Sequence, residues 1–260
     1  MRIDTHTHIG ESKIFASKDF LKPKNIVDLM DRNQIDKAFL IPTASAPRPR
    51  YYEDVVEALK EFPDRFYGFF LANPKEKNVC DQLDMVVNKY GFLGVKLHPT
   101  FLAFAIDDQE LVYPIMEKVR ELKICAVVHS DPFLYATPWQ VGLMAMDFPD
   151  VPIVMAHMGF VDVIFADAAI KMARRAPNLY LDTTGVSADT KVTAAARAIG
   201  ASRILCGSDS PFTNPAFAIA RIECTELSDQ EKKLILGENA KRLMDSLGRK
   251  RKVLGKGFSP

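Results

Sequence analysis

The sequence is poor in cysteine, almost neutral in net charge and without long apolar runs. Its four cysteines stand far apart with no Cys-x-x-Cys motif, which argues against a zinc knuckle, a redox motif or a disulfide scaffold and favours a reducing cytoplasm. The net charge of +1 predicts no nucleic-acid partner for the body of the chain. No apolar run approaches the length of a membrane span, and strand-like sequence starts at residue 2, so we expect no membrane segment and no signal peptide.

The composition is that of a globular protein with a large core, because 48% of the 260 residues are hydrophobic and 26% are charged. This length suits one α/β barrel, which typically needs about 250 residues, although two smaller domains are an alternative. No linker divides the chain, so we predict a single domain over residues 1–247. In the basic tail at 248–260, "GRKRKVLGKG" is either a nucleic-acid-binding segment or a solvated terminus. This segment has no interleaved aromatic residues, which favours the solvated terminus, and we assign it no function.

Short apolar or β-branched runs alternate along the chain with longer segments of helical periodicity. Eight runs predict strands, over residues 2–9, 37–42, 65–72, 93–99, 124–130, 152–159, 179–185 and 203–210. The segments between them predict helices, for example over 25–33, 52–62, 79–91, 110–123 and 190–200. Strands that alternate with helices indicate a parallel sheet, and eight such units predict an α/β fold of the (β/α)₈ TIM-barrel type. One or two extra C-terminal helices are expected over 228–247, with Ser228 as N-cap and Glu231 three residues later.

All five histidines fall near the C-terminal ends of predicted strands, namely the first, fourth, fifth and sixth. They are His6, His8, His98, His129 and His157. Asp209 holds the same place on the eighth predicted strand. The active site of a TIM barrel lies at this end of the strands. One histidine there is explained by a structural hydrogen bond, whereas five together predict a metal site.

The stretch "DTHTHI" supports this prediction. Side chains alternate along a strand, so His6 and His8 point the same way, about 6–7 Å apart along the strand and within reach of one ion. Imidazole and carboxylate ligands with an open position hold catalytic zinc or a similar divalent ion. Such an ion lowers the pKa of a bound water from 15.7 to about 7.

Six motifs cover nearly the whole chain in order: "DTHTHIG" (4–10), "GVKLHP" (94–99), "VVHS" (127–130), "AHMG" (156–159), "GSDSPF" (207–212) and "LGENAKRL" (236–243). Together they resemble the amidohydrolase superfamily, and their order and spacing resemble its branch related to aminocarboxymuconate semialdehyde decarboxylase, which includes TIM-barrel metal-dependent hydrolases. The resemblance implies that His6, His8, His129 and Asp209 bind one divalent ion, zinc first, with manganese, iron or nickel as alternatives. It also implies that His157 stands beside the bound water as general base or acid, and that Asp209 shuttles the same proton.

Lys96 and His98 on the fourth predicted strand face the same way, and we expect them to contact substrate or to support the site. In many superfamily members a lysine on this strand is carbamylated and bridges two metals, which is an alternative role for Lys96. The TatD-type deoxyribonucleases share the early His-x-His and the late Ser-Asp-Ser-Pro, but they are expected to carry a glutamate ligand on the fourth strand. The motif "GVKLHP" has none, which counts against a phosphoesterase.

Other residues are candidates for the wall of a substrate pocket. Arg48 and Arg50, in the loop after the second predicted strand, either anchor an acidic substrate or are solvated. Asp182 either orients a ligand histidine or satisfies local backbone donors. Aromatic residues after the strand ends either line a small-molecule pocket or pack on helices; they are Phe101, Phe133, Tyr135, Phe160 and Phe212.

The sequence therefore predicts a cytoplasmic metal-dependent hydrolase, in which activated water attacks a small carbonyl, amide, ester or lactone substrate. One alternative is a decarboxylase of an aromatic or unsaturated acid that uses the same metal site. Another is a catalytically silent binding barrel, although the full set of ligand types speaks against it. We expect a small-molecule substrate and neither a nucleic-acid nor a membrane partner, and by analogy with the superfamily a homodimer.

Overall fold

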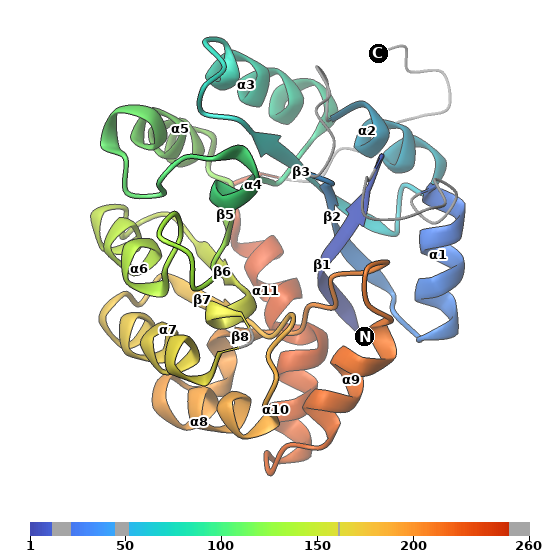
Figure 1. Ribbon diagram of the computed structural model, residues 1–260. Coiled ribbons are helices and arrows are strands. Elements are labelled where there is room, and N and C mark those ends of the chain that lie inside the picture. Colours follow the sequence, from blue (N-terminus) through green and yellow to red (C-terminus); the bar gives the residue numbers. More distant parts are fainter. Residues whose placement is uncertain (12–21, 45–51, 161, 250–260) are drawn as a thin grey trace.

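The strands of the protein form the barrel that the sequence predicts (Figure 1). The computed structural model describes residues 1–11, 22–44, 52–160 and 162–249. Eight strands pair in parallel in the order of the sequence: β1 (Ile3–Ile9), β2 (Lys37–Pro42), β3 (Phe66–Ala72), β4 (Gly94–Leu97), β5 (Cys125–His129), β6 (Ile153–Ala156), β7 (Leu179–Asp182) and β8 (Ile204–Leu205). Backbone hydrogen bonds from Thr5 N to Cys206 O and from Asp209 N to His6 O, both 2.9 Å, join β1 to the end of β8. The TIM-barrel prediction is confirmed.

Helices surround the barrel as a ring, which Figure 1 shows from one end. They are α1 (Pro23–Arg32), α2 (Tyr52–Glu61), α3 (Val79–Tyr90), α4 (Pro99–Leu102), α5 (Gln109–Leu122), α6 (Pro138–Asp147), α7 (Val163–Arg175), α8 (Asp189–Ile199), α9 (Pro215–Glu223), α10 (Asp229–Lys233) and α11 (Asn239–Ser246). Short turns of other helix types are η2 (His157–Gly159), η3 (Ala201–Arg203) and η4 (Leu234–Glu238). Within the described ranges, no helix combines the length and the apolar character that a membrane crossing needs.

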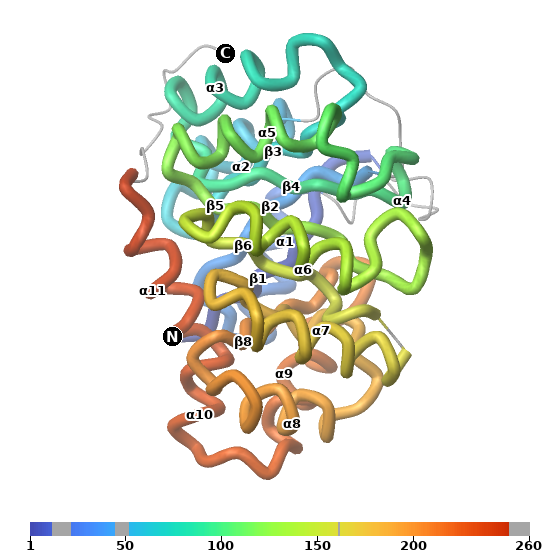
Figure 2. The backbone as a smooth tube through the Cα atoms, turned by 90° about the vertical axis from the view of Figure 1, so that its left-hand side faces the viewer, coloured from blue at the N-terminus to red at the C-terminus, as the bar shows by residue number. Residues whose placement is uncertain are grey.

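The apolar core has two layers. The outer layer lies between the strands and the surrounding helices. The inner layer fills the barrel, where Phe39, Phe69 and Val127 from the strands meet Leu243 and Met244 from α11. Figure 2 shows α11 at the end of the barrel opposite to α4. Helix α11 therefore closes the N-terminal end of the barrel, and the C-terminal end is left for the site.

An irregularity in β1 directs its histidines inward. The register with β2 shifts between Asp4 and Thr7. Ile3 accordingly packs in the inner layer and Ile9 in the outer layer, although strict alternation would place both on one face. The rings of His6 and His8 lie 5.0 Å apart between centroids, which confirms that they point the same way.

Five strands, β4 to β8, end before the last residue that the sequence predicts for them. β4, β6 and β8 stop before His98, His157 and Asp209, which therefore lie in the turns that follow. An apolar run reports burial, whereas a strand ends where the chain leaves the hydrogen-bonded ladder. The predicted capping box of the C-terminal helices is confirmed, because the Ser228 hydroxyl accepts from Glu231 N and the Glu231 carboxylate accepts from Ser228 N. Arg48, Arg50 and the tail from residue 250 lie outside the described residues.

Candidate metal centre

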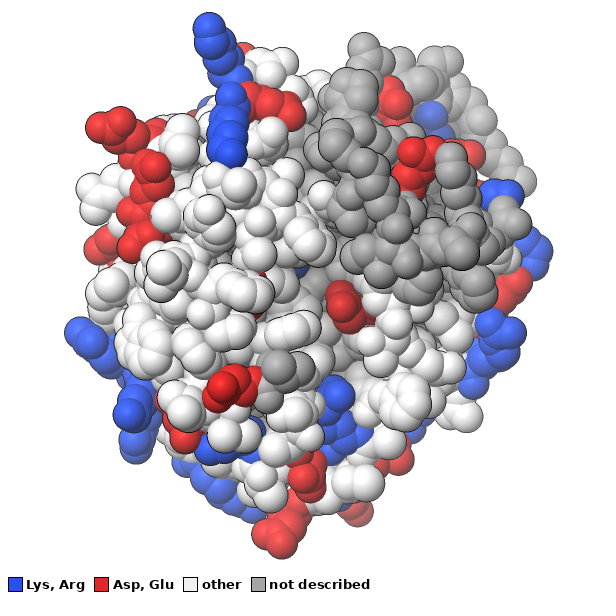
Figure 3. Space-filling view, in the orientation of Figure 1, with Lys and Arg blue, Asp and Glu red and all other residues white. Residues whose placement is uncertain are grey.

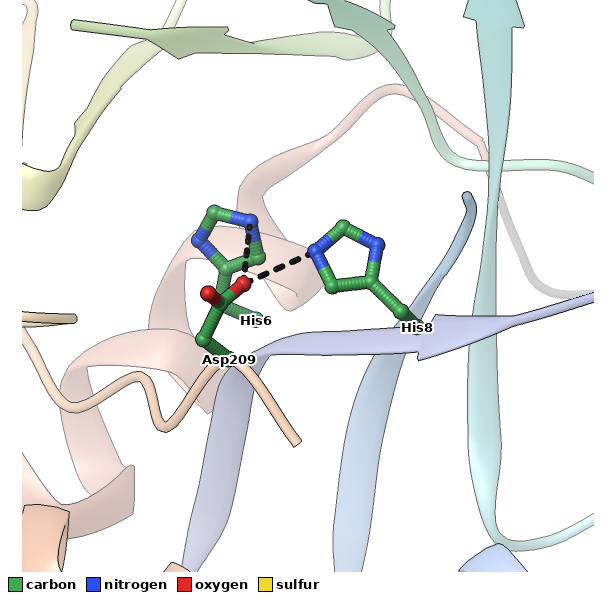
Figure 4. A group of neighbouring side chains, drawn as sticks. All are labelled: His6, His8 and Asp209. Carbon is green, nitrogen blue, oxygen red and sulfur yellow. Dashed lines mark hydrogen bonds and ion pairs between the residues drawn. The ribbon is translucent and has the colours of Figure 1, made fainter. Parts of the chain in front are cut away.

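His6, His8 and Asp209 form a compact cluster at the C-terminal end of the barrel (Figure 4). One ligand atom from each residue lies within 4.8 Å of the others. His8 Nε2 is 2.9 Å and His6 Nε2 is 3.8 Å from Asp209 Oδ1. Two ring nitrogens from β1 thus converge on one carboxylate oxygen from the turn after β8.

The other three histidines adjoin this cluster without belonging to it. The His157 ring lies 4.8 Å from that of His6 and 4.6 Å from that of His129, between centroids. His98 stacks on His129 at 4.0 Å with 16° between the ring planes. His129 directs its Nε2 to Asp131 Oδ2, 3.0 Å away. All five predicted histidines therefore meet at one end of the barrel, on four different strands or the turns after them.

The turns that carry two of these residues have unusual backbone conformations. His157 (φ 69°) and Asp209 (φ 65°) both lie in the left-handed region, which residues other than glycine seldom adopt. Met158 and Phe160 beside His157 also have positive φ. Backbone strain of this kind is held in place by surrounding contacts and concentrates at functional sites. Asp209 N is fixed by its hydrogen bond to His6 O, and Phe160 N by one of 2.7 Å to His157 O.

Burial and neighbouring charges set the protonation of the cluster. Burial, with Lys96 and nearby histidines, holds the pKa of His6 well below its usual range, and burial with His129 does the same to the pKa of His157. Both rings are therefore neutral at pH 7. Burial alone would raise the pKa of Asp209, but the hydrogen bond with His8 and the nearby charge of Lys96 help to hold this pKa well below the usual range of a carboxyl group.

Lys96 supports the cluster from below rather than lining a pocket. Its side chain is buried, and Nζ lies 3.2 Å from His6 Nε2. Burial lowers the pKa of Lys96 to about 8, although the charges of Asp209 and Asp182 oppose this shift. The lysine supplies positive charge next to two buried carboxyl groups.

Asp182 lies on the other side of His6. Its Oδ2 is 3.8 Å from His6 Nδ1, which is too long for a hydrogen bond. The same carboxyl group accepts hydrogen bonds from Thr5 Oγ1 (2.9 Å) and Thr184 N (2.7 Å). Burial raises the pKa of Asp182. Its hydrogen bonds are therefore local, and none of them reaches His6.

The cluster fits a divalent cation. Four buried ring nitrogens find no hydrogen-bond partner among the described residues: Nδ1 of His6, His8, His129 and His157. Neutral imidazoles beside an ionised carboxylate are a donor set that zinc, manganese and similar ions accept. The Nε2 atoms of His6 and His8, which face Asp209, are the nitrogens placed to hold such an ion.

A cavity of about 320 Å³ opens above the cluster. Its described lining comprises His6, His8, Thr43, Ala44, His98, Thr100, Phe101, His129, Asp131, Phe133, His157, Phe160, Asp209 and Phe212. Among the predicted pocket residues, Tyr135 and Lys96 are not part of this lining. Figure 3 shows this face of the molecule, where uncharged side chains cover most of the described centre and charged ones gather toward the edge.

Three polar residues of the cavity wall, Thr43, Thr100 and Asp131, are not identified by the sequence analysis, and two of them, Thr100 and Asp131, contact each other. Both lie within three residues of a strand end, and Asp131 follows His129 by two positions. That spacing is the one signal in the sequence that points to Asp131. Burial would raise the pKa of Asp131, but hydrogen bonds from His129 and Thr100 hold it below its usual range.

The chain belongs to the amidohydrolase family, an enzyme family whose model matches residues 3–245. The resemblance seen in the six motifs is thereby confirmed. No match was found among curated proteins.

Solved structures share the fold at low sequence identity. One is 2,6-dihydroxybenzoate decarboxylase from Rhizobium, with 19% identity, a TM-score of 0.71, and coverage of 94% of this chain and 98% of that one. A second is dihydroxybenzoic acid decarboxylase from Polaromonas sp. JS666 with bound manganese and the inhibitor 2-nitroresorcinol. It has 20% identity, a TM-score of 0.72, and coverage of 94% of this chain and 96% of that one. A third is a probable 2-pyrone-4,6-dicarboxylic acid hydrolase from Acinetobacter baumannii with bound citric acid. It has 16% identity, a TM-score of 0.71, and coverage of 94% of this chain and 99% of that one.

Proposed function

We propose that the protein is a metal-dependent decarboxylase of small, planar carboxylic acids. The observation that carries this proposal is the composition of the cavity. Its floor consists of imidazole and carboxylate groups, and phenyl rings form much of its wall: Phe101, Phe133, Phe160 and Phe212. Flat apolar walls favour a flat, unsaturated substrate through stacking and edge-to-face contacts. The volume of about 320 Å³ is at the small end of ligand pockets, which suits a single ring.

The residues that would hold the ion are His6, His8, His129 and Asp209. When bound, a divalent ion polarises substrate oxygen atoms and lowers the pKa of water. The sequence favours zinc, and the manganese in the Polaromonas decarboxylase supports manganese as the alternative. Both ions accept this donor set.

His157 and Asp209 are the groups that would move a proton. Decarboxylation breaks the bond between a ring carbon and the carboxyl carbon, releases carbon dioxide and needs a proton at the ring carbon. Because the buried His157 is neutral, it can accept a proton from water or from a substrate hydroxyl and return it to that carbon. Asp209, on the cluster's other edge, can relay the same proton. The names of the Rhizobium and Polaromonas structures support this reaction.

Hydrolysis of a ring lactone is the second candidate. The observation that favours it is the same neutral His157, which can take a proton from water as that water attacks a carbonyl carbon. The Acinetobacter structure, a probable hydrolase of a pyrone dicarboxylic acid, supports it. Both candidates use a planar ring with a carboxylate, so one cavity serves either reaction.

The first experiment is elemental analysis of protein purified without chelators or a histidine tag. We expect about one ion per chain, and none in the double variant His6→Ala/His8→Ala. Lys241→Ala is the matched control, because this exposed residue lies on α11 at the far end of the barrel. About two ions would support a carbamylated, bridging Lys96. No ion after reconstitution with zinc or manganese would contradict the proposal.

The second experiment identifies the reaction. The metal-loaded protein is incubated with a panel of hydroxybenzoic acids and, separately, of pyrone carboxylic acids. Release of carbon dioxide that the double variant lacks supports the decarboxylase. Ring opening without carbon dioxide supports the hydrolase instead. If neither occurs while the ion is bound, the catalytically silent barrel is the remaining interpretation.

A further inference from the structure

Asp131 is a buried carboxylate in the cavity wall to which the proposed reaction gives no role. It is 2% exposed and follows β5 by two residues. Its Oδ1 accepts from Phe133 N at 2.9 Å, and its Oδ2 faces two side chains, His129 Nε2 at 3.0 Å and the hydroxyl of Thr100 on α4. All three neighbours are donors to an ionised carboxylate, which can only accept.

These contacts determine which nitrogen of His129 carries the proton. A carboxylate oxygen at 3.0 Å requires hydrogen on Nε2. The neutral ring then has its lone pair on Nδ1. That atom is buried and meets no hydrogen-bond partner within the described ranges. His129 thus differs from His6 and His8, whose Nε2 atoms are the ones that approach Asp209.

The plane of the His129 ring is fixed separately. The His98 ring stacks on the His129 ring, with 4.0 Å between centroids. The Phe101 ring in turn stacks on His98, with 4.4 Å between centroids and 19° between the planes. Stacking does not distinguish the two edges of the ring, since a half-turn about its Cβ–Cγ bond leaves the plane unchanged. The hydrogen bond between His129 Nε2 and Asp131 excludes the flipped ring, in which the carbon Cε1 would face the carboxylate.

We propose that Asp131 is a positioning residue that holds His129 in the Nε2-protonated tautomer and presents its Nδ1 as the fourth metal ligand. This inference rests on the proposed metal centre. Carboxylate partners of ligating histidines commonly act in this way, and their loss typically costs 10–100-fold in metal affinity.

The informative variant is Asp131→Asn. The asparagine carbonyl keeps the bond to Phe133 N, so its amide NH₂ takes the position that faces His129 Nε2. That group donates, and it therefore stabilises hydrogen on Nδ1, the tautomer that cannot bind an ion through Nδ1. We expect the affinity for manganese or zinc, measured by competition with a chelating dye, to fall 10–100-fold.

Asp162→Asn is the matched control. Asp162 Oδ1 accepts from Ile164 N at 2.7 Å, the same i to i+2 contact that Asp131 makes with Phe133. In the described part of the chain Asp162 contacts no histidine, and it caps α7, which begins at the next residue. If Asp131 served only its local turn, both variants would leave metal affinity unchanged, and the inference would be wrong.

The tautomer is measured directly in metal-free protein by ¹⁵N–¹H correlation of the imidazole nitrogens. Five histidines give few signals, and a His129→Gln variant assigns the one of interest. We expect hydrogen on Nε2 in the native chain and on Nδ1 in Asp131→Asn. Hydrogen on Nδ1 in the native chain would overturn the inference even if the variant did not fold. A native chain with the expected tautomer that bound no ion would instead refute the proposed metal function.

Discussion

At the scale of single residues, close packing inside the barrel leaves no room beside β4. The Phe69 ring stacks on Phe39 at 4.8 Å between centroids. It also lies over Gly94, where a Cβ atom would be 2.1 Å from Phe69 Cε1. The floor of the site, with Lys96 two residues along β4, rests on this layer.

We therefore expect Gly94→Ala to destabilise the protein by about 1–3 kcal/mol, because the phenyl ring must leave its stacked position. The measurement is the free energy of unfolding in urea. Gly68→Ala on β3 is the control: its Cβ would meet the flexible tip of Leu59 at 2.9 Å in the outer layer, so a smaller loss is expected. An equal loss in the two variants would show that the ring is not the cause.

At the scale of elements, α11 is tied to the barrel by one buried side chain. Asn239, 1% exposed, donates from Nδ2 to Ala201 O (2.7 Å) in η3 and to Ile204 O (2.8 Å) at the start of β8. These carbonyls gain a partner from a helix that also fills the end of the barrel with apolar side chains. The helix and the last strand are thus positioned together.

We expect Asn239→Ala to lower the free energy of unfolding by about 1–3 kcal/mol, since two buried carbonyls each lose a hydrogen bond from this side chain. Lys241→Ala on the same helix removes only an exposed ion pair with Asp245, which is worth at most about 1 kcal/mol. Urea denaturation of both variants tests this. Equal stability of the two would contradict the anchoring role of Asn239.

The elements also show what the sequence can predict and what it cannot. Apolar periodicity is sufficient for eight strands and their order, because burial leaves a direct pattern. It does not reveal the register shift in β1, which depends on pairing with β2. Nor does it show that His157 and Asp209 adopt left-handed backbone angles, since neither residue type requires them. The role of Asp131 depends on a contact with Thr100 from another turn, and no local pattern encodes such a contact.

At the scale of the whole molecule, fold and family are confirmed, and the chemistry stays a proposal. The roles of Arg48 and Arg50 stay predictions because these residues lie outside the described ranges. The single-domain organisation, the cytoplasmic location and the homodimer also stay predictions.

Metal binding should stabilise the whole fold, because an ion that binds only the native state adds free energy by mass action. At a free ion concentration one hundred times Kd, the expected gain is about 2.7 kcal/mol. Removal of the ion with a chelator should lower the melting temperature measured by differential scanning fluorimetry. In His6→Ala/His8→Ala the chelator should have no effect. A shift of equal size in that variant would place the stabilising ion elsewhere.

The barrel closes where β1 is hydrogen-bonded to the end of β8, and this has a consequence for the order of events during synthesis. His8 and Asp209 are separated by 201 positions in sequence, yet they meet where the barrel closes. A nascent chain emerges from its N-terminal end, so the paired histidines precede their carboxylate partner by the time that about 200 residues take to be translated. The proposed ion can therefore be captured by the full ligand set only as the last strand docks. Metal loading would then report completion of the barrel, and incomplete chains would leave the ion in the cellular pool.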